Sequence, residues 1–227
     1  MTAVPLQADT WLVIPLYNEA QVVREVIEQA RGTFSNIVCI DDGSSDNSVA
    51  EALAGGAVVV QHPMNLGQGA ALQTGLEFAL AQPGAEYFVT FDSDGQHRTE
   101  DAANMVNRLR NEPLDIVVGS RFLDGRTNPG AIKKLVLRAA VLFERLTTGV
   151  KLTDAHNGLR ALNRTAAERI KITQNRMAHA SEFVALIGTQ KLRYAEEPVH
   201  VIYTDYSRAK GQSLWNSVNI LSELFIK

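Results

Sequence analysis

Two aspartates one residue apart, Asp92 and Asp94, are the residues of this sequence best suited to chemistry. They follow an apolar run at 87–91 and stand in a loop that Gly95 opens. Paired carboxylates at a strand end can hold one hard divalent cation and leave coordination positions for phosphate oxygens, so Mg²⁺ or Mn²⁺ is the expected ion. Because Asp and Gly are also turn formers, a solvated turn leading to a helix at Thr99 is the alternative.

A second acidic loop runs from Asp41 to Asp46. Ser45 or Asp46 can cap the following helix, but the adjacent pair Asp41 and Asp42 exceeds what capping requires. Carboxylates accept hydrogen bonds from a nucleobase imide or a ribose hydroxyl, and Glu19, after the first apolar run, can do the same. The loop therefore fits recognition of a nucleoside.

A glycine-bearing segment, Gly67-Gln68-Gly69, begins a predicted helix. Its backbone N–H groups could bind an anion, or the small residues could allow close packing against the helix, and both interpretations stay open. It is not a dinucleotide fingerprint, because that motif has a third glycine where this chain has Leu72 and lies after the first strand.

Charge is distributed unevenly along the chain. Residues 1–118 carry 5 Lys and Arg against 16 Asp and Glu, a net charge of −11, while residues 119–227 carry 17 against 9, a net charge of +8. The split suggests a cation as the partner of the first half and an anionic ligand or surface as the partner of the second. The alternative is that solvated faces differ by chance.

The composition is that of an ordinary globular protein, with 45% hydrophobic and 21% charged residues in 227. The single cysteine, Cys39, excludes an intramolecular disulfide framework and a cysteine-based zinc site. No run of 18 apolar residues and no basic-then-apolar leader occurs, so we expect neither a membrane span nor a signal peptide. The expected location is the cytosolic side of a membrane.

The elements that must position these residues alternate between strands and helices. Buried strands are predicted at 11–14, 37–40, 57–60, 87–91 and 115–118. Helices are predicted at about 19–31, 46–54, 67–81 and 99–110. This alternation predicts an α/β fold, a mainly parallel sheet with helices on both faces, whose ligands bind beyond the carboxyl ends of the strands. The second half is less regular, with predicted helices at 131–148, near 180–190 and from about 213, and a strand pair near 192–203.

The motifs together carry a resemblance. Pro15-Leu16-Tyr17-Asn18-Glu19, the Asp41–Asp46 loop, Asn65-Leu66-Gly67-Gln68-Gly69, Asp92–Gln96 and Gly119-Ser120-Arg121 stand in an order that resembles the family 2 glycosyltransferases of the GT-A fold, within roughly residues 11–213. Thr153–Arg160, Glu196–Val199 and Arg208–Ser213 look like the T-D-x-x-x-G-[FL]-R, E-x-P-V and basic G-x-S segments of the polyprenol-phosphate mannosyl- and glucosyltransferase branch.

That resemblance implies a single GT-A domain over 1–227, with a nucleotide- and metal-binding half at 1–118 and an acceptor-binding half at 119–227. It also implies the site residues. The nucleotide pocket would be lined by Pro15, Tyr17, Glu19, Asp41, Asp42, Gln68 and Asp92. Asp92 and Asp94 would hold the metal, with Gln96 as an extra ligand; Arg121, Arg208 and Lys210 would meet the acceptor phosphate. Many relatives have lysine at the position of Gln68, so no charged contact to the donor is expected there.

The implied reaction moves a hexose from a GDP- or UDP-sugar to a polyprenyl phosphate. That phosphate is largely dianionic at pH 7, so no general base is required, and direct displacement would invert the anomeric centre. A metal ion at Asp92 and Asp94, together with the guanidinium of Arg121, would then offset the repulsion between the acceptor phosphate and the diphosphate leaving group. A sugar hydroxyl as acceptor would instead need a carboxylate base, for which Asp154 is the candidate.

Partners follow from the same pattern. In 131–148 an apolar stripe lies beside Lys133, Lys134, Arg138 and Arg145, which is typical of a helix on an anionic bilayer or of a core helix with a basic solvated face. We expect peripheral contact with the cytoplasmic face of a membrane and no nucleic acid, with a homo-oligomer or a membrane-protein partner left open. A haloacid-dehalogenase phosphohydrolase and a sugar nucleotidyltransferase fit the motif contexts less well, and a non-catalytic nucleotide-sugar-binding module is the main rival.

Overall fold

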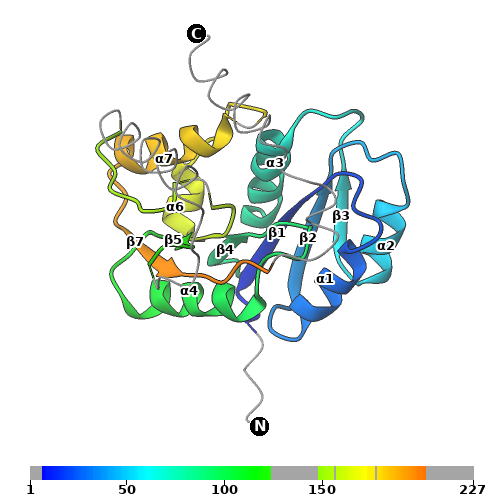
Figure 1. Ribbon diagram of the computed structural model, residues 1–227, viewed down its shortest axis with the longest axis horizontal. Helices are drawn as coiled ribbons and strands as arrows, with labels where there is room; N and C mark the ends of the chain where they lie inside the picture. Colours follow the sequence, from blue (N-terminus) through cyan, green and yellow to red (C-terminus); the bar gives the residue numbers. More distant parts are fainter. Residues whose placement is uncertain (1–6, 124–147, 156, 177, 203–227) are drawn as a thin grey trace.

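The computed structural model describes residues 7–123 and 148–202, except 156 and 177. Seven strands form one sheet in the order β3-β2-β1-β4-β6-β5-β7 (Figure 1). The strand bounds are β1 Thr10–Leu16, β2 Asn36–Asp41, β3 Val58–Gln61, β4 Tyr87–Thr90, β5 Ile116–Ser120, β6 Arg160–Asn163 and β7 Tyr194–Pro198. The predicted α/β class with a mainly parallel sheet is confirmed.

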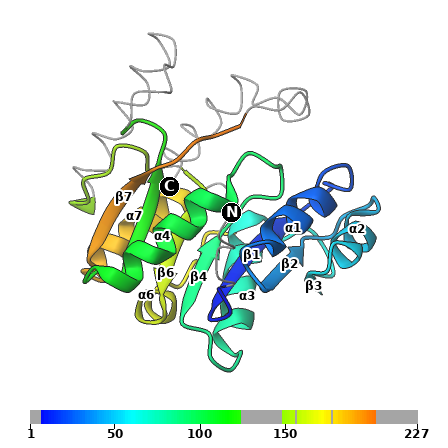
Figure 2. The same ribbon diagram turned by 90° about the horizontal axis from the view of Figure 1, so that it is seen from below.

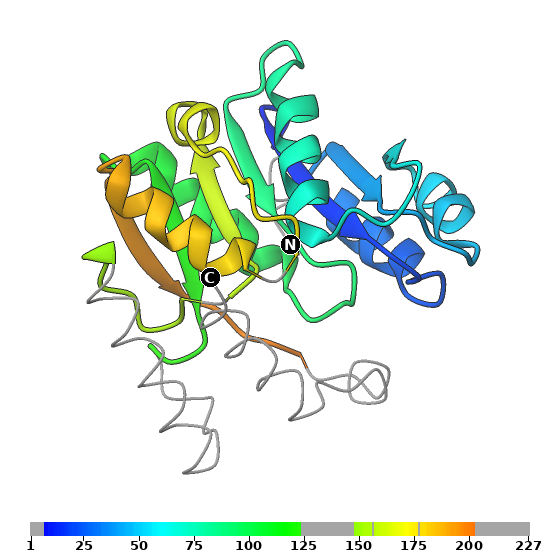
Figure 3. The same cartoon turned by 90° about the horizontal axis from the view of Figure 1, so that it is seen from above.

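Six helices of the described residues cover the two faces of the sheet. Their bounds are α1 Val23–Arg31, α2 Ser48–Ala54, α3 Gln68–Leu80, α4 Thr99–Asn111, α6 Arg164–Arg169 and α7 His179–Thr189. One hydrophobic core holds the apolar sides of α1 and α4, which lie in front when the molecule is seen from below (Figure 2). The other core holds those of α3, α6 and α7, and α3 and α7 lie in front when it is seen from above (Figure 3).

Strand β6 was not predicted, and it is the one described strand that runs antiparallel to its neighbours. It pairs with β4 on one side and β5 on the other, with Arg160 opposite both Thr90 and Val118. Because β6 runs the other way, its first residue lies at the edge where β4 ends. Residues from the second half of the chain are thereby brought beside Asp92.

The strand pair predicted near 192–203 is corrected to one strand, β7, among the described residues of that range. Strand β7 is parallel to β5. After it the backbone N–H of Val199 donates to the Ser120 carbonyl and that of Ile202 to the Gln96 carbonyl, so the chain runs on toward the Asp92–Gln96 loop. The helices predicted at 131–148 and from 213 lie almost wholly or wholly outside the described residues. Across the described ranges, no helix has the length and hydropathy needed to cross a membrane.

Candidate active site

A pocket of about 440 Å³ opens at the edge of the sheet where β1, β2 and β4 end. Its lining comes from both halves of the chain. The loops after β1 and β2, with Asn65, line one end, and the start of β6 and α7 lines the other, with the loop after β4 between them. The lining residues are Pro15, Leu16, Tyr17, Glu19, Asp42, Asn65, Gly67, Gln68, Ala71, Leu72, Asp92, Ser93, Asp94, Gly158, Arg160, His179 and Ala180.

The loops after β1 and β2 hold each other in place. Ser44 Oγ accepts a hydrogen bond from the backbone N–H of Asn18 at 2.9 Å, and the Asn18 side-chain oxygen accepts one from the Ser45 N–H at 2.9 Å. The Glu19 N–H donates to Ser48 Oγ at 2.7 Å. Tyr17 stays 47% exposed at this end of the pocket. A preformed, partly exposed aromatic surface is therefore available to a flat ligand.

The adjacent aspartates Asp41 and Asp42 have different positions. Both Asp41 carboxylate oxygens accept from the Ser44 N–H at 3.3 Å, and Asp41 is not among the residues that line the pocket. Asp42 does line it, and its carboxylate accepts from the Leu66 N–H at 2.9 Å and the Gly67 N–H at 2.7 Å. His62 Nδ1 lies 2.8 Å from Asp42 Oδ1. Asp42 thus fixes the loop that leads into α3.

The glycines at the start of α3 serve close packing. A Cβ on Gly69 would lie 2.0 Å from the carbonyl oxygen of Gln174, and one on Gly67 would lie 2.2 Å from that of Asn175. The Gly69 N–H donates to the Asn175 carbonyl at 2.8 Å. Of the two interpretations of this segment, the structure favours packing over anion binding. Gln68 lines the pocket, and its Nε2 donates to Asp92 Oδ1 at 3.3 Å.

The two central carboxylates, Asp92 and Asp94, carry opposite pKa shifts. Burial opposes ionisation of Asp92, but the neighbouring His97, whose Nε2 lies 2.8 Å from Asp92 Oδ2, and then Arg160 favour it, so the pKa of Asp92 is lowered. Burial and then the charge of Asp92 raise the pKa of Asp94 to about 6, against a hydrogen bond from the Gln96 N–H. The negative charge of Asp94 is therefore less compensated than that of Asp92.

That electrostatic imbalance fits a divalent cation between the two carboxylates, because a cation would remove the repulsion that Asp94 feels. Within the described parts of the chain, no group of three or more His, Cys, Asp or Glu side chains forms a metal site. Asp92 and Asp94 offer two carboxylates to a cation, whose further positions ligand oxygens or water could fill. Gln96 does not line the pocket, and its backbone donates to Asp94 Oδ1 and accepts from the Ile202 N–H.

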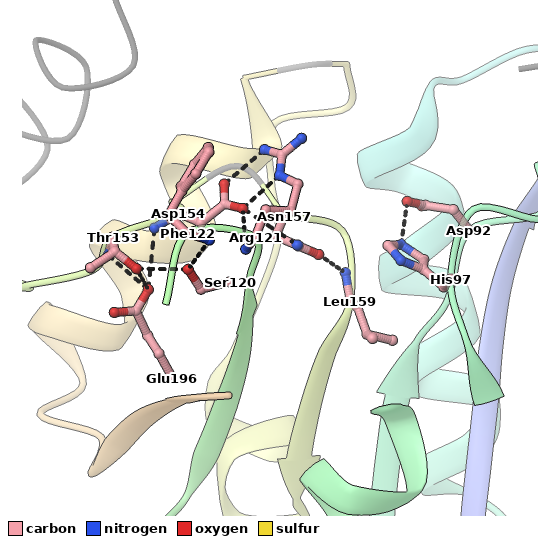
Figure 4. A network of polar contacts seen from close by, with 10 residues as sticks. All are labelled: Asp92, His97, Ser120, Arg121, Phe122, Thr153, Asp154, Asn157, Leu159 and Glu196. Atoms are coloured by element: carbon pink, nitrogen blue, oxygen red, sulfur yellow. Dashed lines mark hydrogen bonds and ion pairs between the residues drawn. The ribbon is translucent and has the colours of Figure 1, made fainter. Parts of the chain in front are cut away.

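Arg121 and Asp154 form an ion pair beyond the pocket lining (Figure 4). Arg121 Nε lies 2.6 Å from Asp154 Oδ2, and Arg121 Nη2 lies 2.8 Å from Oδ1. Asp154 is 2% exposed, and Glu196 Oε1 accepts from its N–H at 3.2 Å and from the Thr153 N–H at 2.7 Å. Arg121, expected to bind the acceptor phosphate, and Asp154, the candidate general base, are therefore paired with each other. Arg208 and Lys210 lie outside the described residues.

Arg160 is the pocket residue that the sequence did not single out. It is 1% exposed, and its guanidinium carbon lies 4.4 Å from the ring centroid of Phe183. Burial lowers the pKa of Arg160 to about 10, while the charges of Asp92 and Asp154 oppose that change. Arg160 is the last residue of the Thr153–Arg160 motif, so the motif includes it. Nothing in the sequence around it indicated that this first residue of a short strand is buried.

His179, the first residue of α7, lies at the same end of the pocket. Burial and then the neighbouring Arg160 lower its pKa from 6.5, so His179 is neutral at pH 7. Its Nδ1 lies 2.7 Å from the Arg176 carbonyl oxygen, which an N–H at that atom would satisfy. Nε2 then carries the lone pair.

Comparison with known proteins places these features in context. The family model described as Glycosyl transferase family 2 matches residues 11–171. An uncharacterized protein of Methanocaldococcus jannaschii is 32% identical, over 96% of this chain and 92% of that protein. A UDP-N-acetylglucosamine–dolichyl-phosphate N-acetylglucosaminyltransferase of Methanococcus voltae is 30% identical, over 95% of this chain and 94% of that protein.

Among solved structures, the glucosyl-3-phosphoglycerate synthase of Mycobacterium tuberculosis in complex with Mn²⁺ and UDP-glucose superposes with a TM-score of 0.73 at 20% identity. The match covers 96% of this chain and 77% of that chain. At this identity the likeness concerns the fold, and it confirms the GT-A fold that the motifs implied.

Proposed function

Because the chain belongs to glycosyl transferase family 2, we propose that it moves a hexose from a nucleotide-diphosphate sugar to a polyprenyl phosphate, inverting the anomeric centre. The observation that carries this proposal is the order of groups along the pocket. One end of the pocket is lined by Tyr17 and Asp42, the paired carboxylates Asp92 and Asp94 come next, and the cation Arg160 lines the other end.

The donor in this proposal is a GDP- or UDP-sugar, with the nucleoside beside Pro15, Tyr17, Glu19 and Asp42. Asp41 supports this end of the pocket by accepting a hydrogen bond from the Ser44 N–H in the turn after β2. Gln68 donates a hydrogen bond to Asp92 and so links this end to the paired carboxylates. The related synthase that was solved with Mn²⁺ and UDP-glucose shares the fold and supports this class of donor.

Asp92 and Asp94 would hold Mg²⁺ or Mn²⁺, with Gln96 close by in the same loop. The ion would act as a Lewis acid that neutralises charge on the leaving diphosphate. His97 holds Asp92 ionised, and Asp94 supplies a second carboxylate whose charge the cation would compensate. Both carboxylates would thus contribute to metal affinity.

The acceptor in this proposal is a lipid phosphate. The relative from Methanococcus voltae is named for transfer to dolichyl phosphate, and the second half of this chain carries a net charge of +8. Arg121 would bind the acceptor phosphate, with Arg208 and Lys210 as further cations of the same role. The domain would work peripherally at the cytoplasmic face of a membrane.

A second candidate function is transfer to a sugar hydroxyl. The observation that favours it is that a buried carboxylate, that of Asp154, lies directly beside Arg121, the proposed acceptor residue. Asp154 would then take the hydroxyl proton. A non-catalytic nucleotide-sugar-binding module would keep the pocket and show no turnover.

The deciding experiment measures release of nucleoside diphosphate over a panel of nucleotide sugars, with Mn²⁺ or Mg²⁺, and with polyprenyl phosphate or a soluble sugar as acceptor. We expect release that requires the lipid phosphate. Release that requires only the soluble sugar would support the second candidate and contradict the first. Binding of a nucleotide sugar without release under any condition would identify a binding module.

A further inference from the structure

Arg160 combines complete burial with an unused hydrogen-bond donor. Its Nη1 is one of two buried side-chain polar atoms of the described residues that have no hydrogen-bond partner, the other being His97 Nδ1. A buried guanidinium N–H without a partner costs free energy, and in native proteins such a donor is satisfied by a ligand, an ion or an ordered water. Arg160 is also one of the residues that line the pocket.

The surroundings hold the guanidinium in place without occupying that donor. The group packs 4.4 Å from the centroid of Phe183, a residue of α7 that is fully buried. Arg160 interacts electrostatically with Asp92 and Asp154, yet the hydrogen bonds of Asp92 come from His97 and Gln68. The charge of Arg160 thus acts on both the Asp92 carboxylate and the Asp154 carboxylate.

The type of ligand follows from charge. Of the described residues that line the pocket, Arg160 is the one Lys or Arg, whereas Glu19, Asp42, Asp92 and Asp94 are acidic. His179 beside it is neutral at pH 7, because burial and Arg160 lower its pKa. A guanidinium matches phosphate oxygens in geometry and charge, so an anionic oxygen is the group that Nη1 suits best.

The position of Arg160 selects one phosphate. In the sheet order, β6 lies on the far side of β4 from β1 and β2, whose loops form the nucleoside end. A diphosphate that starts at that end and passes Asp92 and Asp94 brings its outer phosphate toward Arg160. We propose that Arg160 Nη1 binds an oxygen of the β-phosphate of the donor, an inference that rests on the proposed donor class.

In the reaction, the bond between the anomeric carbon and the β-phosphate oxygen breaks as an acceptor oxygen bonds to that carbon. The bonding electron pair leaves with the nucleoside diphosphate, whose added negative charge faces Arg160. A preformed cation at that position stabilises the charge as it develops. Arg160 would therefore be a catalytic residue that touches the leaving group.

The test compares nucleoside diphosphate with nucleoside monophosphate, since only the former carries the β-phosphate. Calorimetry with Mn²⁺ would use UDP and UMP, or GDP and GMP if the panel shows a guanosine donor. In Arg160→Met we expect the affinity for the diphosphate to fall about 10-fold more than that for the monophosphate, as loss of a charged hydrogen bond implies. Arg160→Lys, which keeps the charge, should fall less.

Two controls separate this role from a structural one. Arg24→Met removes a guanidinium that is paired with Glu28 on the surface, and both affinities should stay unchanged. In Arg160→Ala, guanidinium ion at a non-denaturing concentration should restore preference for the diphosphate. Equal losses for both nucleotides in Arg160→Met, or no loss, would overturn the inference. If the wild type binds the diphosphate but transfers no sugar, the proposed function is wrong. The difference between diphosphate and monophosphate affinity in Arg160→Met would still test whether Arg160 binds the β-phosphate.

Discussion

Gly158 lies so close to the carboxylate of Asp92 that a Cβ at Gly158 would be 2.3 Å from Asp92 Oδ2. The Gly158 carbonyl also accepts a hydrogen bond from Thr90 Oγ1 at 2.6 Å, which holds this segment against the end of β4. The glycine of the Thr153–Arg160 motif is thus explained by a close approach to a residue 66 positions earlier in the numbered sequence.

Gly158→Ala should therefore displace the Asp92 carboxylate and weaken its contact with His97. We expect Mn²⁺-dependent binding of nucleoside diphosphate to weaken about 10-fold, because one carboxylate ligand moves. Calorimetry on the variant measures this. Gly32→Ala is the matched control, since Gly32 has a helical φ of −62° and its nearest contact to an added Cβ is an ordinary 3.4 Å. Equal affinity in Gly158→Ala and wild type would contradict the prediction.

Asp94→Asn should abolish transfer while the protein stays folded. Its carboxylate accepts a local hydrogen bond, from the Gln96 N–H two residues later, so little of the fold depends on it. Removing one of two carboxylate ligands should cost most of the metal affinity, and EDTA should stop the wild-type reaction. Circular dichroism and Mn²⁺ titration test both statements. Full activity in EDTA or in the variant would rule out a metal-dependent mechanism.

The raised pKa of Asp94 gives a pH dependence of stability without metal. Its pKa is about 6 in the folded protein against an ordinary 3.8, so the folded state binds the proton more tightly. The stabilising contribution is complete below about pH 4 and is lost as the pH rises through 6. Urea unfolding in EDTA from pH 4 to 7 should show wild type losing stability relative to Asp94→Asn. Parallel curves would refute the assignment.

Arg121→Met should affect the acceptor step and the stability more than donor binding. Asp154 is 2% exposed and would lose its bidentate partner, which costs about 3 kcal/mol of unfolding free energy for a buried pair. Asp154→Asn in the same chain should recover part of that loss. Because neither residue lines the pocket, affinity for nucleoside diphosphate should change little, while turnover with lipid phosphate falls. Loss of nucleotide affinity as large as the loss of turnover would argue against this division.

Lys133 and Lys134, in the helix predicted over 131–148, carry the prediction for membranes. Reversing both to Glu should reduce association with vesicles that contain anionic lipid, because each basic residue near such a surface contributes about 1 kcal/mol. The difference should fade at high salt, where screening shortens the range of these charges. Vesicle sedimentation measures it, with neutral vesicles as the control. Equal sedimentation of wild type and variant would refute the role of this segment.

Much of the first half could be predicted because β1, β2, β4 and β5 are buried and read as apolar runs, while β3 is an apolar run at the edge of the sheet. The run at 37–40 became β2, Asn36–Asp41, and the polar residues after β1, β2 and β4 do meet at one edge. Strand β6 gave no such signal, because Arg160-Ala161-Leu162-Asn163 has polar ends and its first residue is a buried charge. The sequence shows that residue 160 is an arginine. It does not show that the Phe183 ring and the carboxylates of Asp92 and Asp154, which make its burial possible, come from other parts of the chain.

The Asp41–Asp42 pair shows the same limit at the level of the site. The sequence identified the acidic loop, but the side chains of successive residues point in opposite directions at a strand end. Only the contacts show that Asp41 stabilises a turn and that Asp42 lines the pocket. Asp42 gained its position through the Leu66 and Gly67 N–H groups, which lie more than twenty residues later.

The antiparallel insertion of β6 also bears on how the site comes into existence during folding. The Thr90–Gly158 hydrogen bond joins residues 68 positions apart, so the β6 end of the pocket cannot form until a long loop has closed. Closing such a loop carries an entropic cost that local contacts do not, and pairings of this kind form late in many proteins. A chain that has completed only β1 to β4 can hold the acidic residues together but lacks their counter-charge. Because Arg160 is the first residue of β6, the pocket gains its cation only after β6 has paired with β4.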